Sequence, residues 1–412
     1  MMNQSITNQA KIRIFMIYSC VMMFAFSLSS SMYSSLAPFI ITHYGATLTE
    51  SSLFTISSSI GNLLINLLII RMADKYNKAR LLAVLCFIIS AALIVIGRAP
   101  TMAVYLIANC VNGMVGYWID NLTTAYVSDL YGEQRGRYIG ILYTLFAVGS
   151  AVAPTFNTIV LEILGLDWSG SYKISGFFFL MTAISYFIIL VLVKQPEEEG
   201  YQKEEEEVGK LSISEMLRSR NMLALILSGI TMAFYGYFSG MLPTYFSFTN
   251  PEVYTTALRN FILTCYTVGQ MVSRFLYIPL APRLNPIRYL RFQSLFCTIC
   301  SLVCLLIDKP ILWMILMFAS GVISGSAYTM TIVLTCDEYP DHSSSANAAT
   351  GFASGIAYLV ATPIMNMIAD NISFFVAMII PVFFGFATYF IYQFMYHEKS
   401  PGLTLAAKAA KE

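Results

Sequence analysis

Residues 71–80 read RMADKYNKAR and form a short charged segment between two long apolar runs. The segment holds four cations and a single carboxylate, Asp74. It contrasts with the chain as a whole, in which 11% of the 412 residues are charged and 57% are hydrophobic. Because a soluble protein carries about 25% charged residues, most of this chain is expected to lie in lipid. A formal net charge of +1 gives no basis for binding nucleic acid.

Long apolar stretches recur on both sides of this segment. A transmembrane helix needs about 20 mainly apolar residues, because it rises about 1.5 Å per residue across roughly 30 Å of hydrocarbon. Helices also satisfy their own backbone hydrogen bonds in lipid, and the alternating pattern of a membrane barrel is not found. The sequence therefore predicts an all-α membrane protein with twelve transmembrane helices. They are expected at 14–41, 50–70, 80–97, 101–127, 137–164, 171–194, 221–247, 254–281, 287–307, 311–335, 345–369 and 372–395.

Lys and Arg residues are distributed unevenly between the two sides of this predicted bundle. If the N-terminus lies inside, the outside segments hold only Arg98, Lys173 and Lys309. Since cytoplasmic loops carry the excess of positive charge, we expect the N- and C-termini to be cytoplasmic. The short loops favour a multi-pass protein of the bacterial plasma (inner) membrane, and we expect a monomer in the lipid bilayer.

The chain matches itself when it is shifted by 208 residues, which is the pattern of an internal repeat. The matched pairs are Gly61 with Gly269, Gly113 with Gly321, Ala25-Phe26 with Ala233-Phe234, Ala73, Asn77 and Arg80 with Ala281, Asn285 and Arg288, and Asp129 and Tyr131 with Asp337 and Tyr339. We therefore expect two six-helix halves, at 1–194 and 221–398. An acidic cytoplasmic linker at 195–220 would join them, and a tail at 399–412 would follow.

Two six-helix halves, an inside middle loop and the run from Asp74 to Arg80 resemble the major facilitator superfamily. The superfamily signature between helices 2 and 3 is G-x-x-x-D-[RK]-x-G-[RK]-[RK], and Asn77 replaces its second glycine here. The resemblance implies transport by alternating access, in which the two halves move about a central site. It also implies a cytoplasmic gate or conformational latch, with Asp74, Lys75, Lys78, Asp129 and Arg135 as its candidates.

Asp120 is the clearest ionisable residue within a predicted helix. An ionisable residue inside a span costs about 2.5–3.5 kcal/mol, so it is a functional hypothesis by default. Because desolvation favours the protonated form of a carboxyl group, Asp120 is the candidate for proton coupling. The alternative is a structural Asp that bonds to a neighbouring helix. Small and polar residues share its helical face, namely Asn109, Asn112, Gly113, Gly116 and Thr124.

The stretch from Gly116 to Glu133 is similar to helix 4 of fucose–proton symporters, which place a coupling carboxylate where Asp120 falls. Those symporters have a second acid on helix 1, whereas the first predicted helix here carries serines and no acid.

A second polar face lies on the eighth predicted helix, where Arg259, Tyr266, Gln270 and Arg274 fall within about 80° of one another. Organic-anion carriers of the resembled superfamily place a substrate-binding arginine where Arg274 falls. A guanidinium suits a carboxylate because it offers two parallel donors and stays charged. The alternative for Arg274 is a structural bond at the cytoplasmic rim, and Arg259 lies close enough to the outer surface to reach water there.

Aromatic residues of the seventh predicted helix complete the candidate site, because its Gly and Pro residues loosen the helix and broken helices occur at transporter sites. Packing is the alternative reading for these side chains. The substrate-binding candidates are Arg274, Tyr235, Tyr237, Gln270, Tyr266, Arg259, Tyr328 and Asn112.

The chain contains no nucleophile–base pair, metal-ligand cluster or phosphate-binding glycine loop, so the sequence predicts no enzyme, cofactor or metal site. The predicted function is a secondary active transporter of a small polar or anionic solute, driven by protons or by exchange. Organic acids are favoured as substrates, sugar–proton symport comes second and efflux of amphipathic drugs third. The alternative of a different class is a non-transporting receptor or scaffold on the same fold.

Overall fold

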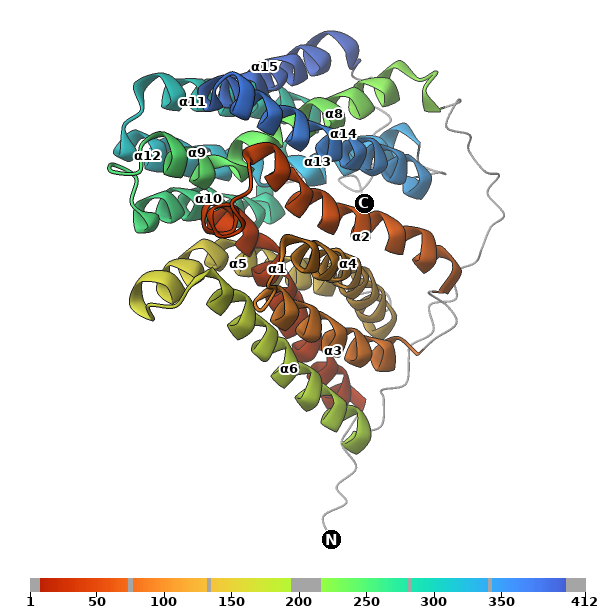
Figure 1. The fold of residues 1–412 in the computed structure, drawn as a ribbon. Coiled ribbons are helices and arrows are strands. Elements are labelled where there is room, and N and C mark those ends of the chain that lie inside the picture. Colours follow the sequence, from red (N-terminus) through yellow and green to blue (C-terminus); the bar gives the residue numbers. More distant parts are fainter. Residues whose placement is uncertain are drawn as a thin grey trace. The chain divides into compact units, whose positions relative to one another are not determined.

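A computed structural model describes residues 8–72, 77–131, 135–193, 216–280, 283–339 and 343–397 (Figure 1). Every regular element in these ranges is helical. The elements from the first half of the chain are α1 (Asn8–Tyr44), α2 (Leu48–Met72), α3 (Lys78–Ile96), α4 (Met102–Tyr131), α5 (Arg135–Thr158), the π-helix η2 (Ile159–Ile163) and α6 (Trp168–Leu192). Those from the second half are α8 (Arg220–Gly240), α9 (Leu242–Thr249), α10 (Thr256–Leu280), α11 (Pro286–Ile307), α12 (Pro310–Ser324), α13 (Ala327–Glu338), α14 (Ser343–Asn371), α15 (Phe374–Phe390) and the π-helix η5 (Ile391–Met395).

These elements match the predicted helices one for one when α5 and η2, α8 and α9, α12 and α13, and α15 and η5 each count as one segment. Ten of the described helices are long and apolar enough to cross a membrane. The two others, α2 and α10, are 25 residues long. The prediction of an all-α membrane protein is confirmed.

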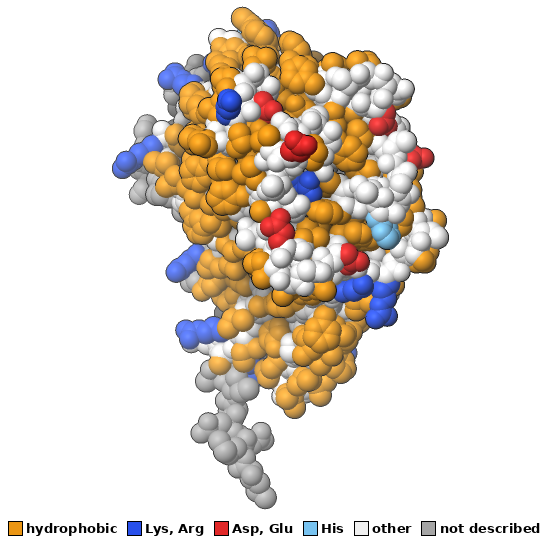
Figure 2. All heavy atoms as spheres, turned by 60° about the vertical axis from the view of Figure 1, so that its left-hand side comes forward, with side chains coloured by type: hydrophobic (Ala, Val, Ile, Leu, Met, Phe, Trp, Pro, Cys, Tyr) orange, Lys and Arg blue, Asp and Glu red, His pale blue; other side chains and the backbone are white. Residues whose placement is uncertain are grey.

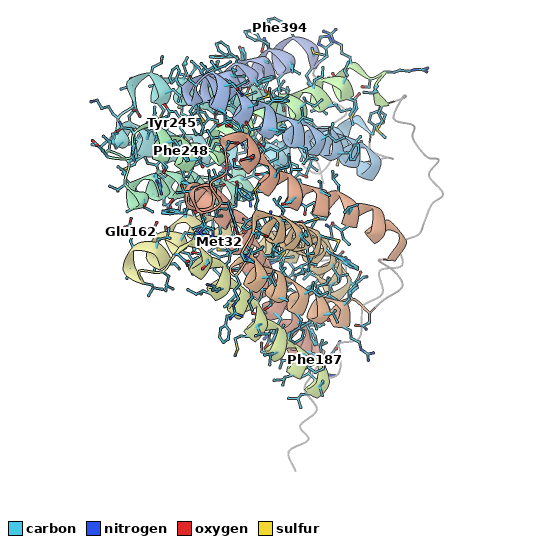
Figure 3. The ribbon with its side chains drawn as sticks, in the orientation of Figure 1. Met32, Glu162, Phe187, Tyr245, Phe248 and Phe394 are labelled. Atoms are coloured by element: carbon cyan, nitrogen blue, oxygen red, sulfur yellow. The ribbon has the colours of Figure 1, made fainter. Side chains whose placement is uncertain are left out.

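Large apolar side chains remain exposed along these helices, as expected of surfaces that face lipid tails. On α6 the exposed residues include Phe177, Phe187, Val191 and Leu192. Figure 2 shows apolar side chains over much of one face, and Figure 3 labels Phe187 on α6.

The chain divides into two compact units. One holds residues 1–46 and 53–203, and the other holds residues 47–52 and 204–412. The start of α2 therefore groups with the second unit, while the helix continues from Leu53 in the first.

The internal repeat reappears in the helix packing of both units. A side-chain carbon added to Gly61 of α2 would collide with the Cys110 carbonyl on α4, and one added to Gly269 of α10 would collide with the Phe318 carbonyl on α12. Cys110 and Phe318 are themselves 208 residues apart. Glycine is therefore required at equivalent points, because two helix backbones approach each other directly there.

The helix starts repeat in the same way. The side chain of Asn77 accepts a hydrogen bond from the Arg80 amide at 3.0 Å, and Asn285 accepts one from the Arg288 amide at 3.1 Å. Each asparagine is thus an N-cap that satisfies one unpaired amide of the helix that follows. The predicted repeat is confirmed at these helix starts.

The end of the last helix is held by side chains from α8 and α11. Arg291 donates from Nε to the Tyr392 carbonyl at 3.0 Å, and Arg220 donates to the Phe394 carbonyl at 2.7 Å (Figure 3 labels Phe394). Asn221 both donates to the His397 carbonyl and accepts from the His397 amide. Cations near a helix C-terminus satisfy carbonyl groups that have no partner within the helix.

Replacing Arg291 with Ala should therefore destabilise the second unit by about 1.5–3 kcal/mol, the usual worth of a hydrogen bond from a charged group. The thermal midpoint of the purified protein measures this effect. Arg218→Ala is the control, since Arg218 is exposed, and an equal loss in both variants would contradict the assignment.

Candidate functional site

The predicted polar face of α4 serves two purposes in the first unit. The part of this face nearer the start of α4 is structural, because Asn109 donates to the Phe54 carbonyl at 2.6 Å and to the Ser57 hydroxyl at 3.0 Å. A side-chain carbon added to Gly113 would overlap the Ser58 carbonyl, so this part also packs closely against α2. The remaining part of the face carries Asp120.

Asp120 lies on α4 opposite Tyr143 of α5. The Tyr143 hydroxyl lies close to the Asp120 carboxyl group and accepts a hydrogen bond of 3.5 Å from Thr124. Oδ1 of Asp120 is buried and has no hydrogen-bond partner among the described residues, and the same holds for Oδ1 of Asn112. Leaving a buried carboxylate oxygen without a partner is costly unless the group takes up a proton or meets a donor. The arrangement therefore suits a group that binds and releases a proton.

Tyr143 was not among the predicted site residues. An aromatic residue within an apolar helix indicates packing or an interface anchor, and nothing in the local pattern distinguishes Tyr143 from its neighbours. Its role follows only from the packing of α5 against α4.

The second unit contains two interrupted helices. The α8 helix ends at Gly240 and α9 begins at Leu242, with Pro243 near its start. The α12 helix ends at Ser324 and α13 begins at Ala327. The first break lies where Gly and Pro residues predicted a loosened helix, whereas the second was not predicted. Such breaks are tolerated at membrane depth where they are enclosed by protein or line a cavity.

Tyr266 of α10 lies near both breaks. Its hydroxyl accepts from Gln270 at 3.2 Å, and the side chains of Ser239 and Ser324, which stand beside the breaks, lie close to it. Nearby, the Tyr235 hydroxyl bonds to the Ser301 hydroxyl at 2.7 Å. This hydroxyl cluster, defined as Tyr235, Ser239, Tyr266, Gln270, Ser301 and Ser324, offers neutral donors and acceptors within one unit.

Arg274 lies on the same α10 helix, one turn beyond Gln270, and its side chain is half-buried. Residues four apart share a helix face, so the cation and the hydroxyl cluster lie along one side of α10. Arg259 is only 5% exposed and donates to Thr256 at 3.3 Å. Its side chain is buried in this structure, and substrate contact by Arg259 stays a prediction.

The remaining substrate candidates lie apart from the hydroxyl cluster. Tyr237 is 1% exposed and its hydroxyl donates to Asn366 at 2.6 Å, within a buried network. Tyr328 is 73% exposed on α13. Substrate contact by either residue stays a prediction.

The structure describes only some residues of the predicted latch. Lys78 at the start of α3 forms an ion pair with Asp129 near the end of α4. Asp74 and Lys75 lie outside the described residues, as does the side chain of Arg135. Within the described ranges, no group of three or more His, Cys, Asp or Glu side chains could hold a metal ion.

The family model described as Major Facilitator Superfamily matches residues 19–307 and 254–411 of the chain. Among solved structures, a bacterial homolog to the human lysosomal transporter Spinster, in an inward-facing and occupied conformation, is similar at a TM-score of 0.72. It is 14% identical, and the match covers 95% of this chain and 99% of that one. The nucleoside transporter NupG is similar at a TM-score of 0.73 with 13% identity, over 93% of this chain and 100% of that one. No curated protein sequence matches the chain.

Proposed function

Because the chain belongs to the major facilitator superfamily, we propose that it is a secondary active transporter of a small organic anion, coupled to protons or working by exchange. The observation that carries the proposal is Asp120, a carboxyl group within a membrane helix that has one buried oxygen without a partner among the described residues. A permanent charge there would be costly. If Asp120 is protonated in one step of the transport cycle and deprotonated in another, its presence within a membrane helix is explained.

Substrate selection is assigned to the second unit. Arg274, Gln270 and Tyr266 lie along one side of α10. A guanidinium binds a carboxylate through two parallel charge-assisted hydrogen bonds, while Gln270 and Tyr266 supply neutral donors and acceptors. Together they suit a small carboxylate that also carries hydroxyl or carbonyl groups.

A neutral, hydroxyl-bearing solute such as a sugar is the second candidate. The hydroxyl cluster favours it, because apart from Gln270 its members carry hydroxyl groups and none is charged. One structure of similar fold is a nucleoside transporter, whose cargo is also hydroxylated. Drug efflux and a non-transporting receptor or scaffold have no comparable support in the described side chains.

The proposed location is the bacterial plasma membrane, with both termini cytoplasmic and the chain a monomer. The orientation rests on the distribution of Lys and Arg between the loops, and the choice of membrane rests on the shortness of the loops. Flux of a solute in proteoliposomes separates a transporter from a receptor on the same fold.

A thermal-shift screen of small carboxylates and matched neutral sugars tests the substrate class. A ligand at 100 times its Kd should stabilise the folded protein by about 2.7 kcal/mol. We expect carboxylates to raise the thermal midpoint and Arg274→Gln to abolish this rise. Arg274→Lys should retain only part of it, because Lys keeps the charge but loses the planar pair of donors. Stabilisation by neutral sugars alone, unchanged in Arg274→Gln, would favour the second candidate.

A further inference from the structure

The π-helix η5, at the end of the last helix, packs against the starts of α8 and α11 within the second unit. Tyr392 and Tyr396 of η5 are buried in one apolar core together with Leu225 of α8 and Leu290 of α11. This core fixes both helix starts against the last turn of the bundle. The polar groups around that turn are therefore held in place by packing.

Two arginines from these helix starts meet at η5. Arg220 of α8 donates to the Phe394 carbonyl at 2.7 Å, and Arg291 of α11 donates from Nε to the Tyr392 carbonyl at 3.0 Å. The two carbonyl groups are two residues apart, so both guanidinium groups lie beside the same turn. A further arginine accompanies each of them along the chain. We term the four residues the arginine patch, which consists of Arg218, Arg220, Arg288 and Arg291.

The first two arginines of this patch are exposed. Among the described residues, neither Arg218 nor Arg220 forms an ion pair with an acid. Glu338 of α13 instead accepts hydrogen bonds from Ser219 at 2.6 Å and from Asn221 at 3.2 Å. The bond from Arg220 to a backbone carbonyl leaves its positive charge in place. The patch therefore presents cations to an anionic partner.

An apolar stripe of α11 leads directly to the arginine patch. Phe292, Ile299 and Leu306 are exposed at intervals of seven residues, which places them on one side of the helix. Exposed apolar side chains on a helix that crosses a membrane face lipid tails. Arg288 is also exposed and lies four residues before Phe292, on the same face. The stripe that faces lipid tails thus ends in a cation.

The last helix shows the same arrangement. Phe383, Phe390 and Phe394 are exposed, and the rings of the last two are stacked with their centroids 6.0 Å apart. Phe394, labelled in Figure 3, also supplies the carbonyl group that Arg220 binds. An exposed aromatic ring and a cation therefore adjoin at a single residue.

We propose that the arginine patch binds the headgroup of an anionic phospholipid, such as phosphatidylglycerol, whose acyl chains lie along Phe292, Phe390 and Phe394. Arginine suits a phosphate because its planar group offers paired charged donors. A free phosphate or an acidic segment of protein would use the cations but not the adjoining rings. In the proposed orientation the patch lies at the cytoplasmic leaflet, whose surface potential is negative. The proposal does not depend on the transported solute.

Titration of the intact protein in neutral detergent with phosphatidylglycerol or phosphatidylcholine of the same acyl chains tests this proposal, with native mass spectrometry counting the bound lipids. We expect phosphatidylglycerol to bind more tightly. Replacing both Arg218 and Arg288 with Gln should weaken its binding about 30-fold, because each cation near a charged membrane surface contributes about fivefold in affinity. Binding of phosphatidylcholine should be unchanged.

The control replaces two exposed cations near the starts of α3 and α5, Arg80 and Arg137, with Gln. Arg80 is the counterpart of Arg288 in the internal repeat, and the same amount of charge is removed. Equal weakening in the two double variants would show only general attraction of anionic lipid. Either that result or equal affinity for the two lipids in the unaltered protein would overturn the proposal.

A phosphatidylglycerol with a photoreactive group on its acyl chain locates the site in the unaltered chain, so the result does not depend on how the variants fold. Labelling should concentrate on the peptides that contain Phe292 and Phe394. Labelling of equal strength on peptides of α3 and α6, which also expose apolar side chains, would overturn the proposal.

Two further measurements separate the lipid from other anions. Glycerophosphoglycerol, which is the same headgroup without tails, should not displace the lipid at equal concentration, and displacement would show a site for free phosphate diesters instead. Replacing the linker acids Glu204 to Glu207 with Gln should leave phosphatidylglycerol binding unchanged. A rise as large as the loss in the arginine variant would show that the acidic linker occupies the patch, and would overturn the proposal.

Discussion

Asp120→Asn is expected to abolish accumulation of substrate driven by a pH gradient while sparing exchange of substrate across the membrane. One pH unit is worth about 1.36 kcal/mol per proton. A transporter that couples one proton can therefore accumulate its substrate about tenfold across such a gradient. Asn has nearly the shape of Asp but cannot take up the proton, so accumulation in proteoliposomes should disappear. Exchange needs no net movement of protons and should continue.

Asp129→Asn is the matched control for this prediction. Asp129 lies on the same helix but forms an ion pair with Lys78 near the end of α4, so its replacement should leave proton-driven accumulation in place. Unchanged accumulation in Asp120→Asn would remove Asp120 from the coupling mechanism. Loss of both accumulation and exchange would instead assign Asp120 to substrate binding or structure.

The helices were predictable from the sequence because lipid imposes one dominant requirement on them. Each span needs an apolar run of about 20 residues, and all twelve predicted stretches contain a helix. The break between α12 and α13 was missed for a physical reason. Ser324, Gly325 and Ser326 are small residues that a membrane helix tolerates, and their effect depends on α10, where Ser273 bonds to Ser326 at 2.9 Å.

The candidate site was predictable only where a residue is costly in lipid. Asp120 and Arg274 stand out in the sequence because a charge inside a span requires an explanation. Tyr143, Ser239 and Ser324 carry no such signal, since hydroxyl groups occur throughout membrane helices. Their relevance arises from neighbours on other helices, which neither helical spacing nor composition can identify.

The contact of Asp370 with the start of α2 was missed for a related reason. Asp370 stands at the end of a predicted span, where an acid is ordinarily solvated and needs no partner. Its partners are the backbone amides of Leu48 and Thr49. A sequence does not indicate which backbone amides a side chain will bind. The repeat was a long-range signal in the sequence, and it paired Gly113 with Gly321, two positions that the structure then places where helices meet.

Replacing Gly321 with Ala is expected to destabilise the second unit by roughly 3 kcal/mol, at the upper end of the cost of overpacking a core. The added methyl group would overlap the Tyr266 carbonyl and lie 3.0 Å from the Gln270 amide nitrogen. Both obstacles are backbone atoms of α10, so no side-chain rotation can relieve the clash and the helices must separate. The separation would also disturb the hydroxyl cluster, because Tyr266 and Gln270 belong to it.

The thermal midpoint of purified Gly321→Ala measures this loss, with Gly355→Ala as the control on α14. Apart from its chain neighbours and its own helix backbone, no heavy atom of the described residues lies within 4 Å of a side-chain carbon added at Gly355. Ala there should therefore leave stability unchanged or raise it by about 0.5–1 kcal/mol, because Gly weakens a helix interior. Gly113→Ala should behave like Gly321→Ala, since its added carbon would overlap the Ser58 carbonyl. Equal midpoints for Gly321→Ala and Gly355→Ala would contradict the close packing of α10 against α12. They would also contradict the repetition of this glycine contact in the two halves.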